Sequence, residues 1–524
     1  MASGVLIAMN GAETLVETLA DQGVEVCFAN PGTSEMHFLA ALENPRIKPV
    51  LCLFEGVATG AADGWYRMMN RPASTLLHLG PGLANGLANI HNAKRASSGM
   101  VNIIGDHSDR HLKFDPPLIS DIEGLARPLC HWVRRADGSH TIAADAAAAV
   151  AKANEHPAKI SALILPGDVS WGDAGKLVRQ PRIAAAPLAP DAGRVDPIAR
   201  VLRSGEPVLI ILGNKATRGP ALDLAGKIAG KTGCRIATQF FSARIERGGG
   251  RVPLERIPYA VPLAMAFLEG FKHIITVETP EPVAFFAYPG RPSQLKPVGC
   301  QVHELVARDE DSLAGLAMLV DALGASGVVP AHQQLSKTPM PSGALNPVSI
   351  AHGLAHAIPE GAIVVDESLT TGRESMGLTA GAAPHDMIQN MGGSIGYSTP
   401  VATGASIACP DRRTICMVGD GSAMYTIQSL WTQAREQLPV TTIIFANNTY
   451  NILKAEYSNM GAGSTIGPRA LSMIDIDKPT IDWCAMAKSM GVPSVSVDTV
   501  DDFTKALVAS IVASGPLLIE VKLY

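Results

Sequence analysis

Two polar turns in the last quarter of this 524-residue chain carry residue types that bind a metal ion and an anion. The first, Gly419-Asp420-Gly421-Ser422, follows the apolar run 414–418, and the second, Asn447-Asn448, follows the β-branched run 440–445. Apolar residues at helical spacing from about 422 to 436 predict one helix between two strands.

A strand–helix–strand unit of this kind forms a right-handed crossover, so both strands end at the same edge of a parallel sheet. Asp420 and Asn447 are therefore expected side by side, and their oxygen atoms suit Mg2+. Gly421 and Ser422 begin the helix, where free N–H groups and a hydroxyl suit a diphosphate. These residue types also occur in ordinary turns. Because both turns end strands of one unit, the pattern favours a site in which Mg2+ bridges the protein and a diphosphate.

A second group of polar residues follows apolar strands in the first third of the chain. Glu55 ends the segment VLCLFEG, where burial would raise its pKa and make it a proton donor or a partner for a ring nitrogen. An equally good interpretation is that Glu55 only stabilises the start of the helix that follows it. His78 ends the next strand and could relay protons, although a single histidine is more often structural. Thr33 and Ser34, in NPGTSE, supply hydroxyls, and Ser34 could cap a helix.

Composition limits the function classes. The chain is 47% hydrophobic and only 17% charged, which predicts a large buried interior and buried subunit interfaces. The net charge of −5 argues against nucleic acid as a partner. No apolar run reaches the length of a membrane span, and residues 1–15 do not resemble a secretory signal. The eight cysteines form no CxxC motif, which predicts core residues in a reducing cytoplasm.

Strands alternate with helices along the chain, and most strands end in Gly, Pro or Asn, which predicts an α/β fold with parallel sheets. Two Pro-rich linkers, 180–196 and 326–347, divide the chain. We therefore expect three doubly wound parallel-sheet domains at 1–180, 190–328 and 345–524.

The central domain looks Rossmann-like, with strands expected at 207–212, 234–238 and 273–277. It lacks a G-x-G-x-x-G fingerprint, so dinucleotide binding is not supported. The run Arg247-Gly248-Gly249-Gly250 is expected to be a flexible loop.

The GDG turn, the 25 residues after it and the NN turn resemble the diphosphate-binding motif of thiamine diphosphate (ThDP) enzymes. The whole chain resembles their decarboxylase group, which includes benzoylformate decarboxylase and the acetolactate synthase large subunit. This resemblance implies pyrimidine-binding, central and diphosphate-binding domains in that order. It also implies ThDP and Mg2+ as cofactors, with Asp420, Asn447 and the Thr449 carbonyl as metal ligands. The other implied cofactor contacts are Thr370, Thr371, Gly393, Ile395, Gly419, Gly421, Ser422, Tyr450, Asn451 and Ile452.

The resemblance also implies catalytic roles. Glu55 matches the glutamate that binds the aminopyrimidine ring of ThDP, and Ile395 the apolar wedge that keeps ThDP bent. His78 matches an active-site histidine of benzoylformate decarboxylase, and Thr33 its substrate-contacting serine. Ala287 stands where that enzyme has a second histidine.

The implied function is decarboxylation or carboligation of 2-oxo acids by an acetolactate-synthase-large-subunit-like enzyme, a lyase or transferase. The alternatives are a benzoylformate-type decarboxylase that releases an aldehyde and a ThDP-binding protein with little catalysis. Glu55 and the GDG turn lie in different predicted domains, and in this family they meet between chains. A homodimer at minimum, and a homotetramer, is therefore expected. The substrate and any flavin in the central domain remain open.

Overall fold

The computed structural model describes residues 9–523, except residues 184 and 337. The chain forms two compact units. The first contains residues 1–186, 391–411 and 425–438, and the second contains 187–390, 412–424 and 439–524. The expectation about a secretory signal rests largely on residues 1–8, which lie outside the described residues. The domain boundaries expected from the linkers stay a prediction.

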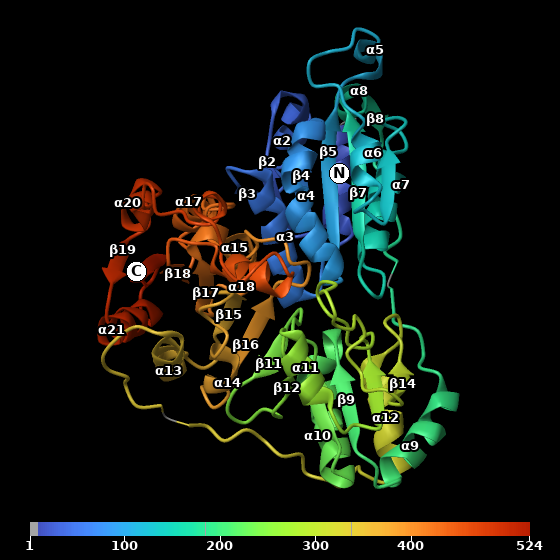
Figure 1. The fold of residues 1–524 in the computed structure, drawn as a ribbon. Coiled ribbons are helices and arrows are strands. Elements are labelled where there is room, and N and C mark those ends of the chain that lie inside the picture. Colours follow the sequence, from blue (N-terminus) through green and yellow to red (C-terminus); the bar gives the residue numbers. More distant parts are fainter. Residues whose placement is uncertain (1–8, 184, 337, 524) are drawn as a thin grey trace. The chain divides into compact units, whose positions relative to one another are not determined.

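The first unit is built on a six-stranded sheet in which every neighbouring pair is parallel. In spatial order its strands are β3 (Lys48–Leu51), β2 (Val26–Asn30), β4 (Ala73–Leu77), β5 (Met100–Asp106), β7 (Ile160–Pro166) and β6 (Trp132–Arg135). Figure 1 shows β2, β4, β5 and β7 in this order. The helices on one face are α3 (Glu55–Met69), α4 (Leu79–Arg95) and α6 (Ile122–Ala126), and those on the other are α1 (Gly11–Asp21), α2 (Met36–Ala41) and α7 (Ile142–Ala153). The sheet is therefore doubly wound, as predicted.

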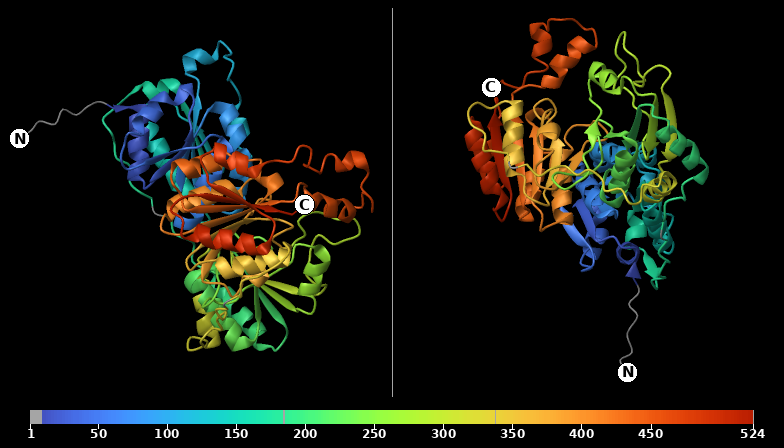
Figure 2. Two further views of the ribbon diagram at one scale, coloured as in Figure 1. Left: turned by 90° about the vertical axis from the view of Figure 1, so that its left-hand side faces the viewer. Right: turned by 90° about the horizontal axis from the view of Figure 1, so that it is seen from below.

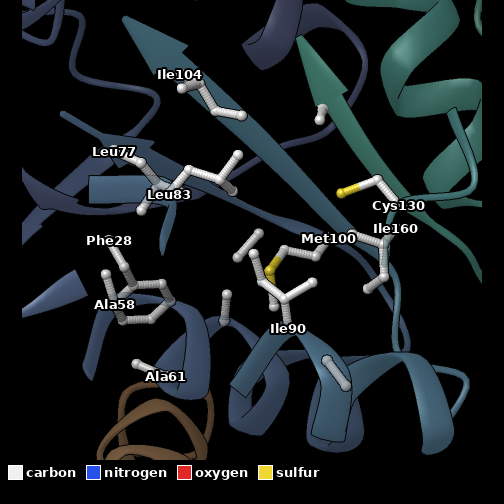
Figure 3. Close-up of a cluster of buried hydrophobic side chains, with 14 of the residues drawn as sticks. Phe28, Ala58, Ala61, Leu77, Leu83, Ile90, Met100, Ile104, Cys130 and Ile160 are labelled. Carbon is white, nitrogen blue, oxygen red and sulfur yellow. The ribbon is translucent and has the colours of Figure 1, made fainter. Parts of the chain in front are cut away.

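One core of this unit lies between the sheet and the helices α3 and α4 (Figure 3). Phe28, Leu77 and Met100 point into it from the strands, and Ala58 and Ile90 meet them from the helices. All five are fully buried, and burial of such apolar area is the main stabilising term for the sheet edge that carries Glu55 and His78.

Small residues allow α3 to contact α15 (Ser398–Ala408) backbone to backbone. A Cβ atom on Gly64 would lie 2.1 Å from the Val401 carbonyl oxygen, and one on Gly404 would lie 1.8 Å from the Ala61 oxygen. Neither position has room for a side chain. The small residues of α3 and α15 thus allow the two backbones to approach closely.

The second unit contains a five-stranded parallel sheet. In spatial order its strands are β12 (Glu255–Arg256), β10 (Arg235–Thr238), β9 (Val208–Leu212), β13 (His273–Val277) and β14 (Gln301–Val306). The helices α9 (Val195–Arg203), α10 (Gly219–Thr232) and α12 (Ser312–Leu323) cover one face, and α11 (Val261–Leu268) covers the other. This is the Rossmann-like arrangement expected for the central segment.

The same unit contains a seven-stranded sheet. In spatial order its strands are β11 (Ile245–Arg247), β16 (His385–Gln389), β15 (Ile363–Glu367), β17 (Thr414–Gly419), β18 (Val440–Ala446), β20 (Leu517–Lys522) and β19 (Ser494–Val497). Only β11 runs antiparallel, against β16. The helices α13 (Pro347–Ala357) and α21 (Val500–Ile511) pack together on one face (Figure 2). No described helix is long and apolar enough to cross a membrane.

Three local predictions were wrong. The helix expected at 422–436 is two helices, α16 (Asp420–Ala423) and α17 (Ser429–Arg435). The turn between them buries Thr426, whose hydroxyl donates to the Gly396 carbonyl oxygen at 2.9 Å. Arg247 ends a strand rather than a flexible loop, because β11 pairs with β16. Gly32 rather than Ser34 is the N-cap residue of the short 3-10 helix Thr33–Glu35.

Candidate functional site

The GDG and NN turns lie side by side, because β17 and β18 are adjacent parallel strands. Asp420 is only 2% exposed and accepts hydrogen bonds from the Asn448 N–H at 2.6 Å and the Gly421 N–H at 2.8 Å. Burial raises the pKa of its carboxyl group, and these backbone bonds oppose that shift. A cation beside a carboxylate that is buried in this way stabilises its charged form.

The rest of this edge can hold an anion. The Ser422 hydroxyl is buried and has no hydrogen-bond partner among the described residues. A Cβ atom on Gly421 would lie 2.3 Å from the Tyr450 ring, so the ring packs directly over that glycine. Glycine thus lets the tyrosine pack over the start of α16, where the Ser422 hydroxyl and the N-terminal end of the helix suit phosphate oxygens.

The loop after β18 is fixed in place. Asn447 Oδ1 accepts from the Thr449 N–H at 3.1 Å, and the Thr449 hydroxyl donates to Asp475 Oδ1 at 2.7 Å. Asn451 and Ile452 then begin α18 (Asn451–Asn459). The Asn448 N–H that bonds Asp420 belongs to the same loop, so the loop that carries Asn447 and Thr449 begins against Asp420.

The strand end of β15 adds one expected contact. The Asn451 side-chain amide lies 3.5 Å from the Thr370 hydroxyl, at the limit of a hydrogen bond. Thr371 is buried, and its N–H donates to the Ser368 carbonyl oxygen. Among the residues that the structure describes, no three His, Cys, Asp or Glu side chains gather as a metal cluster. One carboxylate with amide and carbonyl oxygens leaves ligand positions open, which fits Mg2+ shared with a diphosphate.

Glu55 lies in the first unit as the first residue of α3 and is 5% exposed. Its Oε2 accepts a hydrogen bond from the Asn85 side-chain amide at 3.0 Å. A Cβ atom on Gly82 would lie 2.9 Å from Glu55 Oε1 and 3.3 Å from His78 Cβ, so this glycine lies between the two side chains. The sequence left open whether Glu55 is a buried acid or an acid that stabilises a helix start. In the structure it is both buried and the first residue of a helix.

His78 is the N-cap residue of α4, and its ring lies against Gly32. Its Nδ1 is 2.8 Å from Oε2 of Glu35, a carboxylate that is 1% exposed. Glu35 also accepts from the Gly32 N–H at 2.8 Å and the Ser34 hydroxyl at 2.5 Å.

Sequence reasoning did not place Glu35 beside His78. The available signal was its position, two residues after Thr33 in the turn that follows β2. Thr33 itself is exposed and begins the short 3-10 helix that ends at Glu35. The structure thus brings the turn that carries Thr33 to His78.

The segment that carries Ile395 is fixed to α4 in the first unit. The Asn92 amide donates to the Ser394 carbonyl oxygen at 2.9 Å, and the Asn89 amide donates to the Gly396 oxygen at 3.2 Å. Gly393 and Gly396 have φ values of 78° and 86°, which favour glycine. Ile395 is partly exposed, so it is not an ordinary core residue.

The sequence matches two family models. They are the thiamine pyrophosphate enzyme N-terminal TPP binding domain, over residues 9–125, and its C-terminal TPP binding domain, over residues 375–521. The matched ranges include Glu55, His78 and Thr33 in the first case and both polar turns in the second.

Two curated relatives align along nearly the whole chain. A Mycobacterium tuberculosis protein with the provisional name acetolactate synthase large subunit IlvX is 49% identical over 514 residues, which cover 98% of this chain and 99% of the relative. Benzoylformate decarboxylase of Pseudomonas aeruginosa is 27% identical over 542 residues, covering 96% and 97%.

The fold is also that of a solved structure. The ThDP-dependent 4-hydroxybenzoylformate decarboxylase of Rhodococcus jostii RHA1 superposes with a TM-score of 0.83 over 98% of this chain and 99% of that chain, at 24% identity. Together with the two polar turns at one sheet edge, these matches show that the chain belongs to the thiamine pyrophosphate enzyme family and is a ThDP-dependent enzyme.

Proposed function

We propose that this protein is a ThDP- and Mg2+-dependent enzyme that acts on 2-oxo acids by decarboxylation, carboligation or both, in the manner of an acetolactate synthase large subunit. The observation that carries the proposal is the buried carboxylate of Asp420 beside the unpartnered hydroxyl of Ser422. Both residues follow β17, at the sheet edge where the adjacent strand β18 also ends. The name of the relative that is 49% identical supports the acetolactate synthase type.

The residues at this edge fit the cofactor. Asp420, Asn447 and the Thr449 carbonyl would hold Mg2+. The diphosphate contacts would come from Thr370, Thr371, Gly419, Gly421, Ser422, Tyr450, Asn451 and Ile452. Gly393 and Ile395 would hold the pyrimidine end. When bound, ThDP supplies the electron sink that decarboxylation of a 2-oxo acid requires.

The remaining residues would bind the substrate and move protons. Glu55 would bind the aminopyrimidine ring and hold a proton at its carboxylate. Because Nδ1 of His78 faces Glu35, Nε2 is the nitrogen that would exchange a proton with the substrate. The exposed hydroxyl of Thr33 would bind the substrate carboxylate.

A benzoylformate-type decarboxylase that releases an aldehyde is the second candidate, favoured by His78 at the matching position and by a relative of that name. A ThDP-binding protein with little catalysis is the third. The test is a panel of 2-oxo acids that includes pyruvate and benzoylformate, with ThDP and Mg2+ present. Acyloin from pyruvate supports the first candidate, and aldehyde from benzoylformate the second. No CO2 from any member supports the third.

We also propose a homodimer at minimum, and a homotetramer, with two chains contributing to each site. Mixing Glu55→Gln chains with Asp420→Asn chains tests this arrangement. If sites are shared between chains, random pairing restores up to about a quarter of the wild-type activity, because half of the dimers are hybrids with one intact site. Activity that stays at the level of the separate variants overturns it.

The cytoplasm is the proposed location. All eight cysteines are free thiols, which suits a reducing compartment.

A further inference from the structure

A cavity of about 420 Å³ lies beside β11 and β12 in the second unit. Two arginines line it, Arg247 at the end of β11 and Arg256 at the end of β12. None of its lining residues belongs to the GDG or NN turns, and two strands, β16 and β15, separate β11 from β17 in the seven-stranded sheet. No role proposed above uses either arginine.

Arg247 is a buried charge without an acidic partner. The residue is 8% exposed, its Nη1 donates to the Thr379 hydroxyl at 2.7 Å, and its Nη2 donates to the Met376 carbonyl oxygen. No carboxylate pairs with it among the described residues. Burial lowers its pKa to about 10, so it remains charged at neutral pH. A buried charge with only neutral partners is costly unless an ion of opposite sign joins it.

Arg256 has still fewer contacts. Its guanidinium lies over the Phe240 ring, 4.7 Å from the centroid, and in the described part of the chain it makes no hydrogen bond or ion pair. Burial is the largest effect and lowers its pKa, while the charges of Asp366 and Glu374 act in the opposite direction. The charge of Arg256 also lowers the pKa of Arg247, so the two guanidiniums repel each other.

Among its described residues, the cavity lining holds no acidic side chain that pairs with either arginine. The only acid in the lining, Glu255, is engaged by Arg235, with Oε1 2.8 Å from Nε. Much of the remaining lining is apolar and includes Phe267 and Met376. The volume lies within the range of small-molecule sites, in which a few placed polar groups fix an otherwise apolar ligand.

We propose that this cavity binds a small organic anion, with its carboxylate or phosphate group on Arg256 and Arg247 and its apolar part against Phe267 and Met376. Guanidinium groups bind both kinds of anion through paired N–H donors. The ligand would satisfy the free donors of Arg256 and offset the charge repulsion. This site is additional to the ThDP site.

Calorimetric titration of the full-length protein, saturated with ThDP and Mg2+, tests the proposal. The probes are phenyl phosphate, phenylacetate, inorganic phosphate and the neutral benzyl alcohol. At least one of the two aryl anions should bind once per chain with a Kd below about 1 mM. The stronger of the two identifies a phosphate or a carboxylate ligand. Inorganic phosphate and benzyl alcohol should bind at least tenfold more weakly, because each lacks one part of the ligand.

Two variants localise the binding. Arg256→Met should weaken it at least tenfold, whereas Arg200→Met, an exposed arginine of α9, should not. A Cβ atom on Gly377 would meet no atom within 4 Å, so Gly377→Leu can fill the cavity without a clash at its base and should also abolish binding. Gly377→Ala is its matched control. The proposal is overturned if no probe saturates at 10 mM, or if neither Arg256→Met nor Gly377→Leu weakens the binding.

Discussion

The carboxylate of Glu35 and the imidazole of His78 form a close pair, with Oε2 2.8 Å from Nδ1. The carboxylate is buried, whereas the imidazole side chain is a quarter exposed. Glu35 therefore fixes the ring while the ring can still reach a substrate. This makes Glu35 a positioning residue for the proposed proton transfer.

The first prediction concerns this pair. Glu35→Gln keeps an acceptor for His78 but removes the negative charge, so kcat should fall about 10- to 100-fold with KM changed much less. A changed pH profile of kcat, with partial rescue by Glu35→Asp, would separate positioning from a merely structural role. An unchanged profile with lower melting temperature would contradict it.

The second prediction concerns Glu55. Because its carboxylate would hold the proton that activates the cofactor, Glu55→Gln should lower kcat by about 10²- to 10⁴-fold while the chain still binds ThDP. The variant Asn85→Ala removes the 3.0 Å hydrogen bond to Glu55 but keeps the acid, so it should lower kcat less than Glu55→Gln does. The measurements are CO2 release and ThDP titration. Full turnover in Glu55→Gln would remove Glu55 from the mechanism.

The third prediction concerns Asp420. Without cofactors its buried carboxylate is bonded by backbone N–H groups and has a raised pKa, so burial of this charge destabilises the apo form. Asp420→Asn should therefore leave the melting temperature of the apo protein equal or higher. It should also abolish the stabilisation by Mg2+ and ThDP. Chelation of Mg2+ should inactivate the wild type reversibly. Equal stabilisation of both proteins by the cofactors would argue against Asp420 as a ligand.

The fourth prediction concerns the contact between α3 and α15. A methyl group on Gly404 would overlap the Ala61 carbonyl oxygen, so Gly404→Ala should destabilise the fold by about 1–3 kcal/mol. Thermal melting measures this change. Gly377→Ala, at a helix position with open space, should be neutral within about 1 kcal/mol and serves as the control. Similar melting temperatures for the two variants would show that the helices can separate freely.

The fifth prediction is a pH dependence of stability. Burial, reinforced by Arg247, lowers the pKa of His385 to about 4, below its usual 6.5. Between these values the unfolded chain takes up a proton that the folded chain excludes. The contribution of neutral His385 to the free energy of unfolding is therefore fully present above pH 6.5 and is lost as the pH falls to 4. It amounts to about 3 kcal/mol at most.

His385→Asn should flatten this slope, because the side-chain amide keeps a donor for the Ala383 carbonyl oxygen but does not titrate. His140→Asn, an exposed histidine, should leave the slope unchanged. Melting temperatures at pH 7 and pH 5 are compared for the three proteins. Parallel decreases in all three would exclude His385 as the cause.

The sequence allowed the elements that end at the site to be located, because apolar runs and Gly, Asn and Asp turns are local signals. The strands β17 and β18 and the meeting of Asp420 with the NN turn follow from such signals and one topological rule. The contacts that side chains make with distant segments do not follow from local signals. The bond between Glu35 and His78 joins residues 43 apart in the sequence, so no local pattern predicts that these two side chains meet.

Two elements were missed for tertiary reasons. The helix break at 424–428 depends on a carbonyl group of another segment, the Gly396 oxygen that accepts from Thr426. The strand character of Arg247 depends on a free edge of β16. In both cases the residues themselves have no strong local preference, and long-range partners decide the conformation.

The strand β11 comes from residues 245–247 but completes the sheet formed otherwise by residues 363–522. A C-terminal fragment cut within the second linker would lose this strand and present the backbone of β16 to other chains, which promotes aggregation. The protein is thus less modular than the order of its segments suggests. In a chimera that exchanges the C-terminal segment between relatives, the segment that supplies β11 should be transferred with it.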